Sequence, residues 1–204
     1  MFVASQFCDD HHQNDEDDQA DCKLAAHQQV AWAAQGFDLV VSVNLSPRQF
    51  ASPDLLHDIT GVLRQAGVNP ARMELEITES MLLGEDQHVL GVMRELSALG
   101  LTMALDDFGT GYSNLAYLQR FPIHTLKIDK TFIQDTDANR SLAELIVSLS
   151  TLMKLTAVAE GVETQEQLDW VAKRGIAQYQ GYLYARPMPV QALTDWLLSH
   201  PPKP

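Results

Sequence analysis

The chain has 204 residues, of which 46% are hydrophobic and 20% charged, a composition typical of a folded protein with one large or two small domains. A net charge of −13 argues against duplex DNA or RNA as a partner, because binding to a phosphate backbone needs concentrated lysine and arginine. No stretch approaches the roughly 18 apolar residues that a membrane span requires. The two cysteines, Cys8 and Cys22, form no CxxC pair and predict neither a zinc site nor a disulfide framework, which favours a reduced, cytoplasmic setting.

The first 20 residues are strongly acidic and contain little that a folded core could bury. This composition predicts a disordered tail over residues 1–20, followed by a folded domain over residues 21–204. A metal-binding tract that uses His11, His12 and nearby aspartates is the alternative interpretation. Two adjacent histidines without helical spacing give it little support, so the disordered tail is preferred.

From residue 24 onward, apolar runs bounded by glycine, proline and capping residues predict helices and strands in regular alternation. In chain order, the expected elements are helix Leu24–Ala34, strand Asp38–Asn44, a helix from Ser52 to Gly67, strand Met73–Thr78, helix Asp86–Leu99, strand Leu101–Asp106, helix Ser113–Arg120, strand Thr125–Asp129, a helix from Ser141 to Lys154, strand Thr156–Glu160, a helix from Thr164 to Gly175, strand Tyr179–Tyr184 and helix Pro189–Ser199. Three helix starts carry specific signals: Ser52 before Pro53, and capping boxes at Ser141 and Thr164.

Strands and helices alternate six times in this pattern, which predicts a parallel sheet covered by helices. Polar residues end the strands at intervals of 23 to 32 residues, about one strand–helix unit each. In a TIM-type (β/α) barrel all strand ends face one mouth, so we expect an α/β fold that is an incomplete TIM-type barrel, with about six of the eight strands. A doubly wound sheet is the alternative. It would not place a polar group at nearly every strand end, and the chain has no glycine-rich dinucleotide motif.

The polar residues at the strand ends form one predicted cluster: Asn44, Glu76, Asp106, Asp107, Asp129, Glu160 and Glu163, with Lys127 in the strand before Asp129. Carboxylates this close repel one another unless cations lie among them, and a single lysine is not enough. An all-oxygen ligand set favours Mg²⁺ or Mn²⁺, and a pair of such ions is a recurrent solution for phosphodiester hydrolysis. For any single acid, a solvated loop or a helix cap is the simpler interpretation, and Asp129 in particular fits a cap.

Six motifs resemble the EAL family of cyclic di-GMP phosphodiesterases, in that family's order and spacing: SVNLSPRQF (Ser42–Phe50), ELEITES (Glu74–Ser80), LDDFGTGYSNL (Leu105–Leu115), LKID (Leu126–Asp129), AEGVET (Ala159–Thr164) and QGYLYARPMP (Gln180–Pro189). The resemblance covers the chain from Asp21 to Trp196. It implies a protein of bacterial second-messenger signalling that hydrolyses cyclic di-GMP to linear pGpG with Mg²⁺ or Mn²⁺.

The resemblance also implies a role for each matching residue. It implies metal ligands at Asn44, Glu76, Asp106, Asp107 and Glu160. Lys127 would orient the attacking water, and Glu160 would serve as metal ligand or general base. Supporting or substrate contacts would come from Gln180, Glu163 and Asp129. A regulatory hinge that couples the metal site to a dimer interface would comprise Glu79, Phe108, Gly109, Thr110, Gly111, Tyr112 and Ser113.

One feature of the family is missing from this sequence. The Glu-Ala-Leu strand that gives the family its name, with its metal-binding glutamate and the arginine that follows it, does not occur. The two-metal site would therefore lack one ligand, and the incomplete barrel would expose two apolar strand edges, Leu39–Val43 and Tyr182–Tyr184. Exposed edges invite pairing with another chain, so we expect a homodimer or a covering partner chain.

Three functional hypotheses stay open on the sequence. The first is a phosphodiesterase of the EAL type, with activity impaired by the missing ligand because electrostatic stabilisation dominates such chemistry. The second is a non-catalytic EAL-like module that binds a protein partner or the nucleotide. The third is a truncated gene product that has lost its first strands, for which the intact later motifs and the unrelated acidic head give support.

Overall fold

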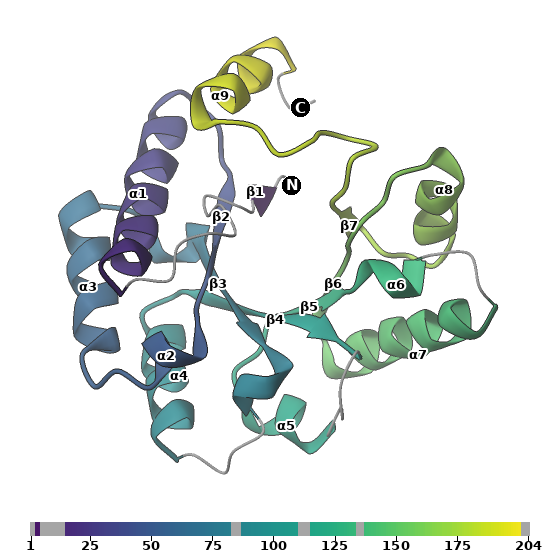
Figure 1. Cartoon of the computed structure of the whole chain (residues 1–204), viewed down its shortest axis with the longest axis horizontal. Helices are drawn as coiled ribbons and strands as arrows, with labels where there is room; N and C mark the ends of the chain where they lie inside the picture. Colours follow the sequence, from purple (N-terminus) through teal and green to yellow (C-terminus); the bar gives the residue numbers. More distant parts are fainter. Residues whose placement is uncertain (1–2, 5–14, 83–86, 110–114, 134–136, 201–204) are drawn as a thin grey trace.

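The computed structural model describes residues 3–4, 15–82, 87–109, 115–133 and 137–200, and its centre is one parallel sheet (Figure 1). Each strand pairs with the next one in the chain. The seven strands are β1 Val3–Ala4, β2 Val40–Asn44, β3 Met73–Thr78, β4 Thr102–Phe108, β5 Thr125–Ile128, β6 Thr156–Ala159 and β7 Gln178–Tyr179. Within the described residues β7 does not pair with β1, so the sheet curls without closing. The predicted incomplete TIM-type barrel is confirmed.

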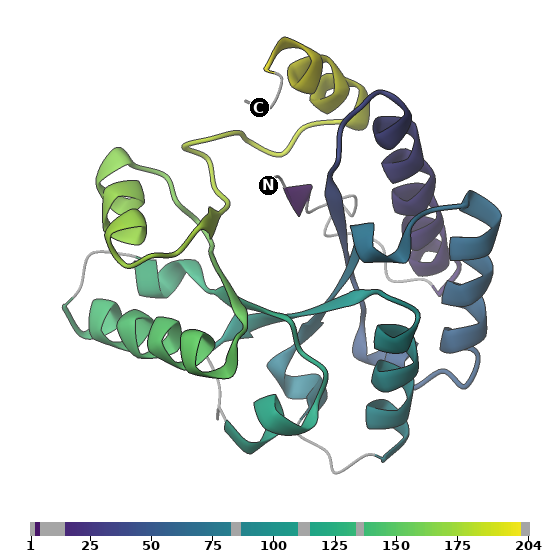
Figure 2. The same ribbon diagram turned by 180° about the vertical axis from the view of Figure 1, so that it is seen from behind.

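Helices cover the outside of the curled sheet, as both views show (Figures 1 and 2). They are α1 Asp15–Ala34, α2 Pro47–Phe50, α3 Leu55–Ala66, α4 Gln87–Ala98, α5 Leu115–Arg120, α6 Lys130–Ile133, α7 Asp137–Met153, α8 Gln165–Lys173 and α9 Val190–Ser199, with short 3-10 helices η1 Pro70–Arg72 and η2 Glu79–Leu82. Strand side chains alternate between the two faces. In β3 the helix-facing Met73, Leu75 and Ile77 are fully buried, and Glu74 and Glu76 alternate with them toward the barrel interior.

Local sequence signals set several helix ends as predicted. Gly67 closes α3 in the left-handed conformation (φ 67°), which glycine adopts without a steric penalty. The capping box at the start of α8 is confirmed, because the Thr164 hydroxyl accepts from the Gln167 backbone and the Gln167 side chain accepts from the Thr164 backbone. Gly67 thus sets the C-terminal end of α3, which precedes β3, and Thr164 sets the N-terminal end of α8, which precedes β7.

Two predicted helix starts are wrong. Ser46, not Ser52, forms a capping box, and it starts the separate short helix α2. The chain then needs a turn before α3, which begins at Leu55 after Asp54. Ser141 lies inside α7, since that helix already begins at Asp137. The predicted start at Ser52 is thus two residues too early, and the predicted start at Ser141 is several residues too late.

The start of α1 differs from the prediction. The helix begins at Asp15 and not at Leu24, so residues 15–20 are helical where a disordered tail was predicted. Acidic residues at a helix start interact favourably with the helix dipole, an effect that composition alone does not reveal. Residues 3–4 of the predicted tail form β1. Residues 1–2 and 5–14, which include His11 and His12, lie outside the described residues. The division between tail and domain stays a prediction.

Both predicted strand edges also need correction. β1 pairs with β2 in parallel, with Val3 opposite Val40 and Ala4 opposite Val41, so the edge predicted at Leu39–Val43 has a neighbouring strand. At the other end, β7 stops at Tyr179, and Tyr182–Tyr184 forms a turn. Gly181 explains this stop, because a Cβ at that position would lie 2.3 Å from backbone atoms of Val162. The close backbone approach and the φ of 153° end the extended strand there.

The helical layer connects the two ends of the open sheet. α9 lies beside α1 in both views, and the indole Nε1 of Trp32 in α1 donates a hydrogen bond of 2.9 Å to the Thr194 hydroxyl in α9 (Figures 1 and 2). Trp32 is completely buried. The first and last helices, α1 and α9, therefore contact each other, although β1 and β7 do not pair within the described residues. Among the described helices, none combines the length and apolar composition needed to cross a bilayer.

Candidate functional site

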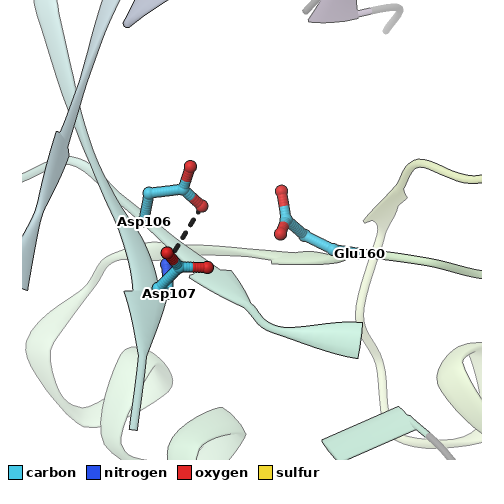
Figure 3. A group of neighbouring side chains, drawn as sticks. All are labelled: Asp106, Asp107 and Glu160. Atoms are coloured by element: carbon cyan, nitrogen blue, oxygen red, sulfur yellow. Dashed lines mark hydrogen bonds between the residues drawn. The ribbon is translucent and has the colours of Figure 1, made fainter. Parts of the chain in front are cut away.

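Three carboxylates meet where β4 and β6 end. Asp106 and Asp107 lie near the end of β4, and Glu160 directly follows β6. One oxygen from each of these side chains lies within 4.8 Å of the others, and Figure 3 shows Glu160 facing the two aspartates across the mouth. The Asp107 backbone N–H donates to Asp106 Oδ1 at 3.0 Å, which fixes the orientation of the Asp106 carboxylate. The carboxyl ends of the strands thus collect acids at one mouth, as the sequence predicted.

Lys127 lies at the centre of this acidic group. Its Nζ is 2.6 Å from Glu76 Oε2, 2.8 Å from Glu160 Oε1 and 3.1 Å from Asp106 Oδ2. Burial alone would lower the pKa of Lys127, but Glu76, Glu160 and Asp106 outweigh it and raise that pKa well above its ordinary value. The lysine therefore stays protonated, and one positive charge is shared by three carboxylates.

Burial, with a smaller contribution from neighbouring negative charge, raises the pKa of three acids of the cluster. Burial raises the pKa of Glu160 to about 7, and Asp106 adds to this shift although Lys127 opposes it. Burial also raises the pKa of Glu76, again against the effect of Lys127. At Asp107 burial and the neighbouring Asp106 raise the pKa of the carboxyl. A carboxyl with a pKa near 7 can accept or release a proton at neutral pH.

The residues present fit a divalent cation. Oε1 of the buried Glu76 has no hydrogen-bond partner within the described part of the chain, whereas buried polar atoms are normally paired. Asn44 is the neighbour of Glu76 across β2 and β3, so both side chains point to the same face of the sheet. Asp107 adopts a positive φ of 53°, a strained backbone of the kind found at functional sites. An all-oxygen set of this type suits a hard cation such as Mg²⁺ or Mn²⁺.

The supporting residues predicted from the sequence lie in different places. Gln180 follows β7, and its Nε2 donates to Glu160 Oε1 at 2.5 Å. Asp129 accepts hydrogen bonds from the backbone N–H (2.9 Å) and hydroxyl (2.6 Å) of Thr131. It therefore caps α6, which is the simpler of the two interpretations that the sequence left open. Glu163 is exposed, and its backbone N–H donates to Gln167 as part of the α8 start. Of these three, Gln180 donates a hydrogen bond to the acidic cluster, and Asp129 lies near enough for its charge to contribute to the raised pKa of Asp107, whose main cause is burial.

The predicted regulatory hinge is only partly described. Glu79 is buried in η2, directly after β3. Phe108 is buried at the end of β4, and Gly109 follows it with a positive φ of 95°. Thr110, Gly111, Tyr112 and Ser113 lie outside the described residues. The hinge therefore stays a prediction.

One polar layer was missed in the sequence. Glu74 is buried on β3, two residues before Glu76, and is surrounded by the hydroxyls of Ser42, Thr102 and Thr125. The signal was present, because the alternation of β3 places Glu74 and Glu76 on the same inward face. The predicted site was built from strand ends, and Glu74 lies near the start of β3.

Comparison with known proteins identifies relatives. A family model for the EAL domain matches residues 13–187. The signaling protein YkoW of Bacillus subtilis is 37% identical over 87% of this chain and 22% of its own length. The cyclic di-GMP phosphodiesterase PdeR of Escherichia coli is 39% identical over 83% of this chain and 26% of its own length. The chain thus spans about a quarter of the length of these curated relatives.

Solved structures give the same result. The PaMucR phosphodiesterase in its c-di-GMP complex superposes with a TM-score of 0.84 at 36% identity, over 87% of this chain and 74% of that chain. BlrP1 of Klebsiella pneumoniae, solved as a manganese and cyclic di-GMP complex, gives a TM-score of 0.76 at 28% identity, over 85% of this chain and 46% of that chain. Both similarities extend over most of the curled sheet and its helices.

Proposed function

The chain belongs to the EAL domain family, and from that membership we propose that it forms the catalytic part of a metal-dependent cyclic di-GMP phosphodiesterase. The proposed reaction is attack of water on one phosphodiester of cyclic di-GMP, which yields linear pGpG. The observation that carries the proposal is the cluster of Asp106, Asp107 and Glu160. The buried Lys127 pairs with two of these acids and with Glu76, and Oε1 of Glu76 has no hydrogen-bond partner among the described residues.

Each residue of the cluster has a proposed task. Asn44, Glu76, Asp106, Asp107 and Glu160 would hold Mg²⁺ or Mn²⁺. Such a cation, when bound, would polarise the phosphodiester and neutralise developing charge. The protonated Lys127 would hold three of these carboxylates in place and orient the attacking water.

Glu160 is the proposed proton acceptor. Its contacts with Lys127 and Gln180 both use Oε1, which leaves Oε2 as the oxygen that can take part in the reaction. Gln180 would therefore act by orienting this carboxylate. Glu163 and Asp129 would contribute less directly, since the first is exposed and the second caps α6.

We further propose that hydrolysis by this chain alone is weak. The sequence contains no Glu-Ala-Leu strand, so one ligand of the proposed two-metal site and a substrate-binding arginine are absent from it. Removing part of an electrostatic catalytic arrangement costs orders of magnitude in rate. A cytoplasmic location, and a homodimer or covering partner chain, stay predictions that fractionation and light scattering would check.

A hydrolysis assay tests the proposal. Purified chain is incubated with Mn²⁺ and cyclic di-GMP, and pGpG is measured by chromatography. We expect slow product formation that disappears in Lys127→Met and Glu160→Gln and persists in the matched control Glu95→Gln, whose side chain is exposed on α4 outside the barrel. Absence of pGpG from the wild-type chain would contradict catalysis.

A non-catalytic nucleotide-binding or protein-binding module is the second candidate, favoured by the missing ligand strand. Calorimetry separates the two. Binding of cyclic di-GMP without any pGpG would support the binding module, and pGpG that depends on Glu160 would exclude it.

A further inference from the structure

A second buried carboxylate lies beneath the acidic mouth. Glu74 of β3 is only 7% exposed, and it faces the barrel interior one strand repeat below Glu76, roughly 7 Å along the strand. No ion pair within the described residues includes Glu74. A buried carboxylate without a cation is costly unless other groups stabilise it.

Three hydroxyls surround this carboxylate. Thr125 Oγ1 donates to Oε2 at 2.7 Å, Ser42 Oγ donates to Oε1 at 3.1 Å, and Thr102 Oγ1 lies 3.4 Å from Oε2. These hydroxyls come from β5, β2 and β4 respectively. Glu74 on β3 thus joins four consecutive strands through one side chain.

The same four strands carry the residues of the mouth. β2 ends at Asn44, β3 carries Glu76, β4 carries Asp106 and β5 carries Lys127. In each strand the mouth residue lies two or four positions beyond the member of the Glu74 layer, on the same inward face. Any change in the relative position of these strands at the Glu74 layer is therefore passed to the mouth.

We propose that Glu74 is a positioning residue for the cation site: its hydrogen bonds hold β2 to β5 in register, and its negative charge below Glu76 strengthens the binding of a divalent cation. The inference rests on the proposed function, because it requires that the mouth binds a cation. Hydroxyl donors suit this role, since they stabilise the carboxylate without neutralising its charge.

Two substitutions separate charge from shape. Glu74→Gln keeps the size of the side chain and removes its charge, whereas Glu74→Asp keeps the charge and shortens the side chain. Binding of Mn²⁺ alone is measured by electron paramagnetic resonance and calorimetry, and thermal unfolding in a chelator reports the fold of each variant separately. We expect Glu74→Gln to bind Mn²⁺ roughly 10-fold more weakly than the wild-type chain, the low end of the range for groups that hydrogen-bond to a metal ligand, because the hydrogen bonds of Glu74 go to hydroxyls and not to the proposed ligands.

The ranking of the two variants decides the proposal. We expect Mn²⁺ affinity to fall in the order wild type, Glu74→Asp, Glu74→Gln. A role of shape alone predicts instead that Glu74→Gln, whose side chain keeps its size, binds Mn²⁺ more tightly than Glu74→Asp. Equal or tighter binding in Glu74→Gln than in Glu74→Asp would overturn the proposal while leaving the proposed function intact. Should the wild-type chain bind no Mn²⁺, both the cation site and the role of Glu74 fail together.

A third substitution covers the case in which Glu74→Gln does not fold. Thr125→Val removes the shortest hydrogen bond to Glu74 and leaves the carboxylate in place. We expect weaker Mn²⁺ binding in this variant as well, with a smaller change than in Glu74→Gln. An unchanged Mn²⁺ affinity would overturn the positioning role.

Discussion

The barrel interior contains two polar layers that differ in how their charges are compensated. At the mouth, Glu76, Asp106 and Glu160 share the single cation of Lys127, and one oxygen of Glu76 has no partner among the described residues. One strand repeat below, both oxygens of Glu74 receive hydrogen bonds from neutral hydroxyls. The described hydroxyls satisfy both oxygens of Glu74 in the lower layer, whereas the mouth leaves an oxygen of Glu76 without a partner among the described residues. Under the proposed function, this difference separates a supporting layer from the layer that would bind the cation.

Removing the positive charge of Lys127 from the mouth should have the largest effect on stability. In Lys127→Met three carboxylates lose their common partner, and breaking a buried ion pair from one side typically costs about 3–5 kcal/mol. We expect a loss of this size in the free energy of unfolding, measured by urea denaturation in a chelator. Lys173→Met, an exposed change in α8, is the matched control. Equal stability of the two variants would show that the mouth does not depend on Lys127.

The second prediction concerns pH. The pKa of Glu160 is raised from 4.5 to about 7, mainly by burial, so the folded chain binds this proton more tightly than the unfolded chain. The stabilisation is fully present below about pH 4.5 and is lost as pH rises through 7, in total about 3 kcal/mol for the metal-free protein. Urea denaturation across this range, in a chelator, should show the loss in the wild-type chain and a much flatter profile in Glu160→Gln. Parallel profiles would refute the assignment.

The lower layer should respond more modestly to the loss of one partner. Thr125→Val removes the 2.7 Å hydrogen bond to Glu74, and bonds to charged groups contribute about 1.5–3 kcal/mol. We expect a loss of that size in the free energy of unfolding. Thr151→Val, at an exposed position on α7, should change stability by less than about 0.5 kcal/mol. If the two valine variants were equally stable, the Glu74 layer would not support the barrel.

The contrast between the layers also shows what the sequence could predict. β3 was predicted with its observed bounds, because buried strands combine apolar residues with period-two alternation. The mouth could be assembled from strand ends, since parallel strands bring their carboxyl ends together. Glu74 could not be found by that rule, because it lies inside a strand, and its partners come from three other strands.

Other errors arose where tertiary contacts outweigh local propensity. Tyr182–Tyr184 has the composition of a strand, yet the chain turns there because Gly181 packs directly on the backbone of Val162. The pairing of β1 with β2 could not be read from a two-residue segment whose only signal is Val3–Ala4. Strand termination and edge pairing depend on neighbours that are distant in sequence.

The smallest expected effect is at Asp129, at the start of α6. The sequence left two interpretations of this residue, a supporting acid of the site or a helix cap, and its hydrogen bonds to Thr131 are those of a cap. Loss of a cap typically costs about 1 kcal/mol, and asparagine caps as well as aspartate. We therefore expect Asp129→Ala to lower the free energy of unfolding by about that amount and Asp129→Asn to keep it. If Asp129→Asn were as destabilised as Asp129→Ala, the charge and not the cap would be what matters, and Asp129 would belong with the acids of the mouth.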